Sequence, residues 1–383
     1  MLHQIVNRFP EEMSFNEKPP LVSIYQTTHR TIFDQKKDLL VFKNLVKEVE
    51  NTLIKYDVND ATMILKRLNS LNEDKEFWDN NDSGIAIFVS KDKCIVYRLV
   101  EEVKELAVVG NSYHVTPLIK AYQFNDTYQL LGLSREYFTI YQGNKYAFKE
   151  LEIDKNVSRT KIEVLGDQLT ESYFTHGTYG GAKGPSMYHG HKDIQQEIDK
   201  DTLKYFRYVD NFIYEQFSKK SKLPLILVAL KEHQGEFRSL TNNPYLISEN
   251  ITMSSEAMSI EELHQKTVMV IDEINDKKIS KAITEFQNQE ARSLGSTDVA
   301  QVAKAAFEGR VETLLIEENV HVYGKMDLNS GKVEFLNNLE ADNNDILDDL
   351  AEMVMFKGGK VIVVSKDKMP SISGLAAIFR YNM

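Results

Sequence analysis

The chain of 383 residues has only one cysteine and no long hydrophobic run. Its single cysteine, Cys94, has no second cysteine with which to form an internal disulfide. No apolar run approaches the roughly 18 residues that span a bilayer, and residues 1–15 lack the apolar core of a signal peptide. These absences predict a reduced, cytoplasmic protein that makes no membrane contact.

Basic residues are outnumbered by acidic ones. The chain has 46 lysines and arginines and 57 aspartates and glutamates, for a formal net charge of -11. This balance excludes a protein that coats nucleic acid nonspecifically, although a local basic site remains open. The phosphate-binding patterns G-x-x-x-x-G-K-[ST] and G-x-G-x-x-G are missing. No nucleophile elbow appears either, so no Ser-His-Asp triad is identified. No cofactor is predicted.

The residues that are present are those of an ordinary globular protein, with 42% hydrophobic and 27% charged residues. The length predicts two or three domains. Hydrophobic spacing predicts a mixed α/β protein of three domains, each with a mixed sheet and packed helices. The predicted domains are residues 1–121, 122–255 and 256–383.

Each predicted domain has its own pattern of elements. The first has an antiparallel helix pair within residues 35–71 and a hairpin of strands at 84–90 and 94–100. The second has three strands within 128–153, a long helix capped by Asp193, and a strand at 223–230 buried on both faces. The third has helices at about 260–294 and 298–308, followed by short strands and a helix that ends near residue 356.

One segment differs from the rest of the chain: residues 176–191, HGTYGGAKGPSMYHGH, have five glycines, three histidines, one lysine and no acid. Such a segment buries little apolar surface, and its glycines lose much entropy if they are ordered. Backbone N–H groups between glycines, beside lysines, suit contact with phosphate oxygens. The candidate tRNA- or ribosome-binding residues are His176, Gly177, Gly180, Gly181, Ala182, Lys183, Gly184, His189, His191 and Lys192.

The three histidines of this segment suggest a metal as the alternative. His176, His189 and His191 could meet around a divalent ion, but no carboxylate or cysteine lies between Tyr173 and Lys192. A catalytic zinc site usually needs a further ligand or base. No metal is therefore predicted, and no catalytic residue is assigned.

The three blocks together resemble the archaeal and eukaryotic class 1 peptide-chain release factors. They more closely resemble the bacterial relatives of these proteins, the archaeo-eukaryotic release factor-like family. The similarity extends over roughly residues 20–383. It is carried by the stretches LVSIYQTTHR, FWDNNDSGIAIFVS, VVGNSYHVTPLI, YQLLGLSREYFTIYQGNKYAFKELEI, HGTYGG, DTLKYFRYVD, LPLILVAL, GRVETLLIEE, DILDDLAEMVMFKGGKVIVV and MPSISGLAAIFRY.

The resemblance implies a role for the glycine-rich segment. In release factors, the middle domain holds a loop at this place that begins with His-Gly and continues with Gly-Gly-Gln. That loop places water against the peptidyl-tRNA ester in the ribosome. His176-Gly177 and Gly180-Gly181 match in kind and order, but Ala182 stands in place of the glutamine. Because alanine can neither donate nor accept a hydrogen bond through its side chain, ester hydrolysis is left open.

The resemblance also bears on the outer domains. Residues 56–60, YDVND, do not reproduce the stop-codon motif of release factors, so codon recognition is not carried over. The third domain resembles the kink-turn RNA-binding ribosomal-protein fold, which release factors use mainly to hold a protein partner. Its acidic helix, with Asp342, Asp345, Asp348 and Asp349, fits contact with a protein better than contact with RNA.

The sequence thus favours a translation-associated, ribosome- and tRNA-interacting protein that releases peptide from stalled ribosomes. One alternative is a non-enzymatic ribosome-binding or hibernation-type factor whose loop only occupies a site. The other is a metal-dependent hydrolase that uses the loop histidines. The sequence does not specify the ribosomal state recognised, the protein partner or the oligomeric state.

Overall fold

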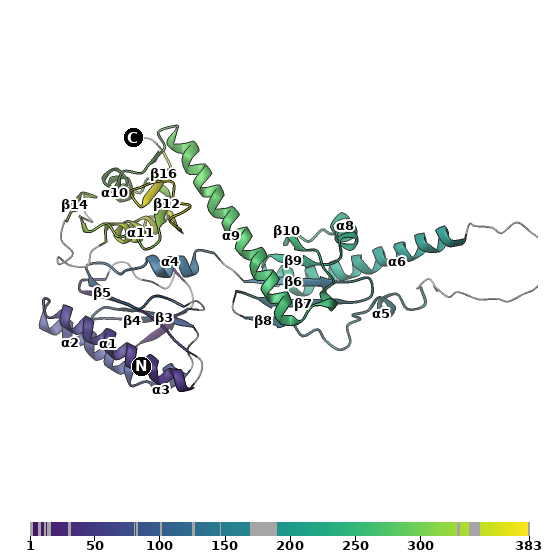
Figure 1. Cartoon of the computed structure of the whole chain (residues 1–383), viewed down its shortest axis with the longest axis horizontal. Helices are drawn as coiled ribbons and strands as arrows, with labels where there is room; N and C mark the ends of the chain where they lie inside the picture. Colours follow the sequence, from purple (N-terminus) through teal and green to yellow (C-terminus); the bar gives the residue numbers. More distant parts are fainter. Residues whose placement is uncertain are drawn as a thin grey trace, which may run out of the picture. The chain divides into compact units, whose positions relative to one another are not determined.

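The structure is a computed structural model, and its contacts divide the chain into two compact units. Unit 1 contains residues 1–125 and 277–383, and unit 2 contains residues 126–276 (Figure 1). The structure describes the chain except residues 1–2, 7–8, 11–12, 14–16, 30–31, 80, 82, 100–101, 125–126, 146, 169–189, 328–329, 337–344 and 382–383.

The first sheet of unit 1 has the strand order β1-β4-β3-β2-β5. Its strands are β1 (Gln4–Val6), β2 (Leu21–Thr27), β3 (Gly84–Val89), β4 (Cys94–Leu99) and β5 (Leu106–Gly110). The predicted hairpin is confirmed, since β3 and β4 are antiparallel neighbours. The edge strand β1 runs parallel to β4. Cys94 is buried in β4, where burial raises the pKa of its thiol to about 12.

Two long helices cover one face of this sheet, as the spacing of apolar residues predicted (Figure 1). They are α1 (Ile32–Leu53) and α2 (Val58–Asn72), and the short α3 (Lys75–Asp79) follows. The lone tryptophan, Trp78, is buried in this core and donates its indole N–H to the carbonyl of Leu71. Asp57 caps α2 by accepting the backbone N–H groups of Asn59 and Asp60.

The second sheet of unit 1 has the order β11-β16-β12-β15 and comes from the last part of the chain. Its strands are β11 (Gly295–Ser296), β12 (Val311–Glu317), β15 (Lys360–Val364) and β16 (Leu375–Phe379). The helices around it are α4 (Thr116–Tyr122), α10 (Val299–Phe307) and α11 (Ile346–Phe356), and β13 (Gly324–Met326) pairs with β14 (Val333–Phe335).

One hydrophobic cluster joins the two halves of unit 1. It contains Tyr25 and Phe88 from the first sheet together with Leu350 from α11, all buried. The first and third predicted domains therefore share packed side chains within one unit. Their independence as separate domains stays a prediction, as do the boundaries after residues 121 and 255.

Carboxylates of α11 reinforce this joint, which corrects the expectation that the acidic helix presents its charge to a partner. Asp345 caps the helix, and Asp342 lies outside the described residues. Asp348 and Asp349, however, are only 2% and 8% exposed. Their carboxylates accept hydrogen bonds from residues 112–116, so they satisfy buried donors rather than face solvent.

Unit 2 is built on a five-stranded sheet of order β10-β9-β6-β7-β8. Its strands are β6 (Tyr128–Leu133), β7 (Phe138–Gly143), β8 (Phe148–Glu150), β9 (Leu225–Val228) and β10 (Leu246–Ile251). All four residues of β9 are fully buried, which confirms the strand covered on both faces. Its helices are α5 (Lys161–Leu165), α6 (Gly190–Ile213), α7 (Lys219–Ser221), α8 (Lys231–Leu240) and the start of α9 (Ile260–Glu290).

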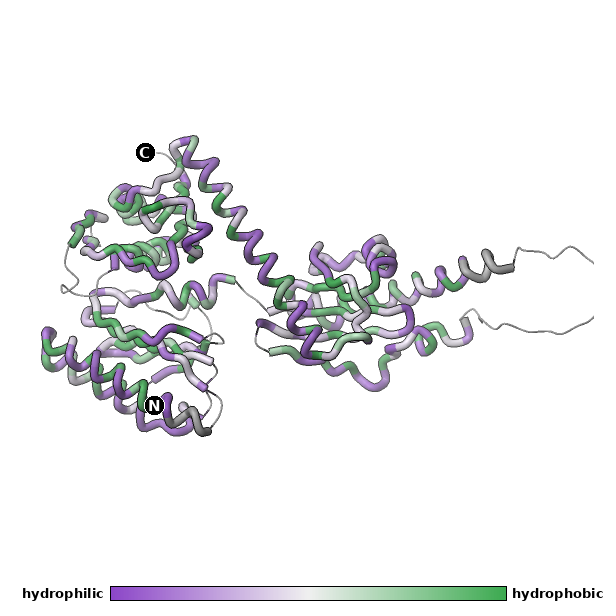
Figure 2. Tube along the Cα trace, viewed as in Figure 1, coloured by the Kyte–Doolittle hydropathy of each residue, from purple (hydrophilic) through white to green (hydrophobic). Residues whose placement is uncertain are grey.

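Two helices contribute the side chains that cover one face of this sheet. Phe206 on α6 and Phe237 on α8 pack against it in one cluster, while Leu263 and Ile271 on α9 pack in another. In Figure 2 the strands of this sheet are coloured mostly as hydrophobic, whereas hydrophobic and hydrophilic residues alternate along α9. The mixed α/β fold class is thus confirmed. Among the described helices, none is both long and apolar enough to cross a membrane.

Candidate functional site

Most predicted site residues lie outside the described part of the chain. These are His176, Gly177, Gly180, Gly181, Ala182, Lys183, Gly184 and His189. His191 and Lys192 belong to the first turn of α6, although their side chains are not described. The helix begins at Gly190, three residues before the predicted cap, so Asp193 lies inside the first turn. Acids are favoured at either position because both lie near the positive end of the helix dipole.

The chain on either side of residues 169–189 is held together firmly. The last described turn before this gap, η1 (Gly166–Gln168), directly follows α5. The hydroxyl of Tyr205 on α6 donates to the carbonyl of Arg159 at 2.7 Å, and the hydroxyl of Tyr208 donates to Ser158 at 3.1 Å. These two hydrogen bonds therefore hold residues 158–159, just before α5, against α6.

A capping box starts α5 and completes this anchor. The Thr160 hydroxyl accepts the backbone N–H of Glu163 at 3.2 Å, and the Glu163 carboxylate accepts the backbone N–H of Thr160 at 3.0 Å. These backbone donors, with a further one from Arg159, lower the pKa of Glu163. The sequence S-R-T-K-I-E therefore fixes the start of the helix locally.

Two cations beside the anchor are neutralised by acids. Lys161 lies 2.6 Å from Glu136, and Arg159 lies 2.8 Å from Glu150 and above the ring of Tyr137. Lys161 is only 7% exposed. Both ion pairs stabilise the start of α5, which precedes the glycine-rich segment. The charges of Lys161 and Arg159 are therefore already neutralised.

Unpaired positive charge lies farther along α6, on the side away from the predicted apolar face. Lys200, Lys204 and Arg207 follow the spacing i, i+4, i+7, so they share one face of the helix. All three are exposed, and no carboxylate of the described residues pairs with Lys200 or Arg207. Lys204 lies 2.9 Å from Asp201, and the exposed Glu197 lies one turn before Lys200.

The opposite side of α6 explains why this basic face is fixed in place. Tyr205, Phe206, Val209 and Ile213 are fully buried against the sheet. A helix anchored along this stripe cannot rotate its charged face inward without exposing large apolar side chains. The i, i+4, i+7 spacing of lysine and arginine was the signal in the sequence that would have found this face.

No group of three or more histidine, cysteine, aspartate or glutamate residues in the described part of the chain could hold a metal ion. His176 and His189, on which the metal-dependent hydrolase depends, lie outside that part, and the side chain of His191 is not described. That alternative therefore stays a prediction.

A known family matches the part of the chain that contains the predicted segment. Residues 126–273 match the model of bacterial archaeo-eukaryotic release factor family 6. The resemblance to the release-factor-like family is confirmed. The matched range coincides closely with unit 2, and it includes both α5 and α6. Among curated proteins, none matches the chain.

Several solved structures are similar to this chain. The archaeal translation termination factor aRF1 shares 15% identity, with 95% of this chain and 94% of that chain covered and a TM-score of 0.24. An archaeal Pelota, from a model of ribosome-bound Pelota and ABCE1, shares 13% identity over 76% and 73%, with a TM-score of 0.41. Dom34 of S. cerevisiae, a translation termination-like factor that interacts with Hbs1, shares 13% identity over 76% and 74%, with a TM-score of 0.35.

Proposed function

We propose that this release-factor-like protein acts in translation by presenting residues 176–192 to the phosphates of ribosomal RNA or tRNA. The observation that carries the proposal is the family match over residues 126–273. The glycine-rich segment lies within that range, after α5 and up to the first turn of α6, where release factors hold their functional loop. The hydrogen bonds from Tyr205 and Tyr208 give the segment a fixed base.

The basic face of α6 supports the same proposal. Lys200 and Arg207 continue the positive charge of Lys183 and Lys192 along the helix that leaves the segment. Contacts of this kind position a protein on nucleic acid without reading its sequence. The protein as a whole is acidic, so binding would depend on this local arrangement rather than on net charge.

Two activities follow from this placement. In the first, the segment reaches a peptidyl-tRNA on a stalled ribosome and promotes hydrolysis of its ester. In the second, it occupies the site without chemistry, as a ribosome-binding or hibernation-type factor. Ala182 favours the second, because its side chain cannot orient a water molecule as the family's glutamine does. The resemblance further suggests that the C-terminal part of the chain holds a protein partner.

Binding is tested by co-sedimentation of the full chain with ribosomes over a range of salt concentrations. Lys183→Ala and Lys192→Ala should weaken binding and flatten its dependence on salt, because fewer counterions are released. Lys231→Ala is the control, since Lys231 is an exposed lysine of α8 outside the segment. Unchanged co-sedimentation in both test variants would remove the proposal.

Chemistry is tested separately with ribosomes that carry a labelled peptidyl-tRNA. Release by the wild-type chain would support the first activity, and binding without release would support the second. Ala182→Gln restores Gly-Gly-Gln, so it should raise release by about tenfold or more if the segment reaches the ester. If neither chain releases peptide while both bind, the segment only occupies a site.

A further inference from the structure

A cavity of about 350 Å³ lies within unit 1, away from the glycine-rich segment in sequence and outside the residues matched to the family. Its wall comes from residues 102–106 beside β5, residues 114–121 in and before α4, and residues 318–321 after β12. Asp345 and Val363 complete the lining. The volume falls in the range of small-molecule sites, which is roughly 300–1,000 Å³.

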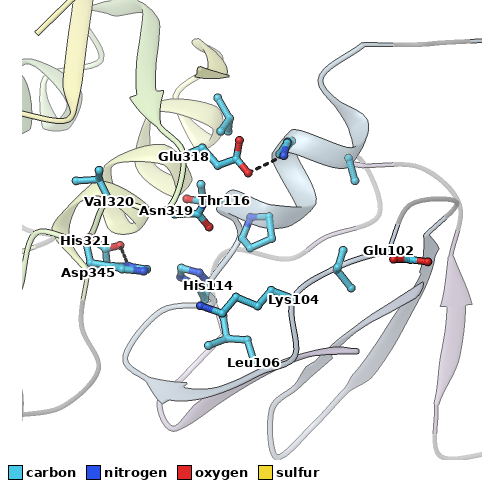
Figure 3. Close-up of a pocket in the computed structure, with 15 residues that line it drawn as sticks. Glu102, Lys104, Leu106, His114, Thr116, Glu318, Asn319, Val320, His321 and Asp345 are labelled. Carbon is cyan, nitrogen blue, oxygen red and sulfur yellow. Dashed lines mark hydrogen bonds and ion pairs between the residues drawn. The ribbon is translucent and has the colours of Figure 1, made fainter. Parts of the chain in front are cut away.

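Two histidines, His114 and His321, line this cavity, and Figure 3 shows His321 bonded to Asp345. Nδ1 of His321 lies 2.8 Å from the carboxylate of Asp345, and Nδ1 of His114 lies 3.3 Å from the carboxylate of Asp348. The centroids of the two imidazole rings are 5.9 Å apart. Two aspartate–histidine pairs from distant parts of the chain therefore stand side by side.

Backbone donors fix both aspartates. Asp345 accepts the N–H of Val322 at 3.0 Å and that of Leu347 at 3.1 Å. Asp348 accepts the N–H groups of Val115 and Thr116. Because these carboxylates are held in place, Asp345 fixes the orientation of the His321 imidazole through its hydrogen bond, and Asp348 stays 3.3 Å from Nδ1 of His114.

This arrangement leaves Nε2 of each imidazole available to a ligand. No described residue forms a hydrogen bond with Nε2 of His114 or His321, and both residues line the cavity. With Nδ1 facing a carboxylate, Nε2 donates a hydrogen bond whenever the ring is protonated. The hydrogen bond to Asp345 raises the pKa of His321, against the opposing effect of burial.

Lys104 adds a third donor to the same side of the cavity. Its side chain is exposed, extends toward His114 in Figure 3, and has no carboxylate partner among the described residues. The positive charge of Lys104 is near enough to His321 to lower the pKa of that residue in part. The ammonium of Lys104 and the two imidazoles thus lie on the same side of the cavity.

Asp345 also lines the cavity, and its carboxylate is occupied by Nδ1 of His321 and by the backbone N–H groups of Val322 and Leu347. Lys120 and Glu318 neutralise each other at 2.6 Å, and Glu102 lies at the far end of the cavity in Figure 3. The other wall is apolar and is formed by Val103, Leu106, Pro117, Ala121, Val320 and Val363. A ligand here would meet an anion-binding corner and an apolar wall.

We propose that this cavity binds a small phosphate monoester, with its phosphate oxygens on Nε2 of His114, Nε2 of His321 and the ammonium of Lys104. Three donors match the three terminal oxygens of a phosphate monoester better than the two oxygens of a carboxylate. The apolar wall receives the organic body of the ligand. This inference concerns unit 1 alone and does not rest on the function proposed for the glycine-rich segment.

The test is calorimetric titration of the full chain with adenosine 5′-monophosphate, ribose 5-phosphate, inorganic phosphate and adenosine. Both monoesters should bind, adenosine should not, and a nucleotide that binds more tightly than ribose 5-phosphate would assign the apolar wall to the base. Lys104→Gln and His321→Gln should each weaken binding of the monoesters by about tenfold or more, because each removes a charged hydrogen bond. Lys366→Gln, at an exposed lysine elsewhere in unit 1, should have no effect.

Protonation gives an independent readout. The groups that face His321 are Asp345, Asp348, His114, Lys104 and the stacked ring of Tyr323, and of these the two aspartates favour its protonated form. Between pH 8 and pH 6.5 the wild-type chain should therefore bind ribose 5-phosphate more tightly by a larger factor than His321→Gln does.

Three outcomes would overturn the proposal. They are no binding of any monoester at millimolar concentration, equal binding by wild type and Lys104→Gln, and binding of zinc in the absence of any phosphate effect. Lys104→Gln keeps the test decisive even if His321→Gln impairs folding, because Lys104 is exposed and its charge is not used in packing.

Discussion

The Oδ1 atom of Asp348 lies 2.8 Å from the backbone nitrogen of Thr116, which is 232 residues earlier in the chain. The same carboxylate accepts the backbone N–H of Val115 and the hydroxyl of Thr116. These donors belong to the start of α4, and such N–H groups have no partner inside their own helix. One buried carboxylate of α11 therefore satisfies the donors at the start of α4, a helix that comes from the N-terminal part of the chain.

Replacement of this carboxylate should destabilise unit 1. In Asp348→Asn, an amide N–H₂ group takes the place of one accepting oxygen and faces buried donors, which should lower the free energy of unfolding by about 1–3 kcal/mol. The measurement is the urea midpoint followed by tryptophan fluorescence. The lone Trp78 lies in the core of unit 1, so the signal reports on that unit.

Glu312→Gln is the matched control for this variant, because Glu312 is an exposed acid of the same unit. Its midpoint should stay within about 0.5 kcal/mol of wild type, as for ordinary surface substitutions. An Asp348→Asn chain as stable as the control would show that the hydrogen bonds to α4 contribute nothing.

The stability of unit 1 should also depend on pH through Glu352 of α11. Burial, followed by the negative charges of Asp348 and Asp349, raises the pKa of Glu352 to about 9. In the unfolded chain its ordinary value is 4.5, so between these values the folded state holds the proton that the unfolded state has released. Stability therefore falls as pH rises through this window and levels off above it.

Glu352→Gln should remove this part of the pH dependence. The glutamine resembles the protonated acid, so the variant should match wild type near pH 5 and exceed it at pH 8.5 by about 1.4 kcal/mol or more, the equivalent of one pKa unit. Urea midpoints at the two pH values provide the measurement. Burial raises the pKa of Asp349 to about 7. The variant should therefore still lose stability as pH rises toward 7, because of Asp349. A Gln variant with the wild-type profile from pH 7 to 9 would contradict the assignment.

The basic face of α6 should contribute to ribosome binding if the proposed function is correct. Lys200→Ala and Arg207→Ala should each weaken binding at low salt and lower the slope of log affinity against log salt by about 0.7–0.9. The measurement is co-sedimentation at several salt concentrations, with Lys231→Ala again as the control. Equal slopes for all three chains would exclude this face from the contact.

Much of the fold was predictable because it depends on local periodicity. Apolar residues such as Leu45, Val49 and Leu53 recur at helical spacing, and they are buried on α1 as that spacing requires. The turn residues 91–93 fixed the hairpin of β3 and β4, and the unbroken apolar run around Ile226 identified a strand buried on both faces.

Features that join distant segments were not predictable from the same patterns. Asp348 and Asp349 read as surface acids at the start of a helix, because nothing local shows that residues 112–116 cover them. His114 and His321 likewise lie some 200 residues apart, so no spacing rule brings them into one cavity. On α6, by contrast, the spacing of Lys200 and Arg207 in the sequence does indicate a basic face. Only the apolar face of that helix was predicted.

The location of Cys94 decides how the chain can be labelled. Its thiol is enclosed in β4 and remains protonated at neutral pH, whereas maleimide and iodoacetamide reagents react with an accessible thiolate. A second cysteine introduced at the exposed Lys200 of α6 would therefore be the main target of a fluorophore in the folded chain. The native protein thus serves as a cysteine-silent background for distance measurements between α6 and a ribosome.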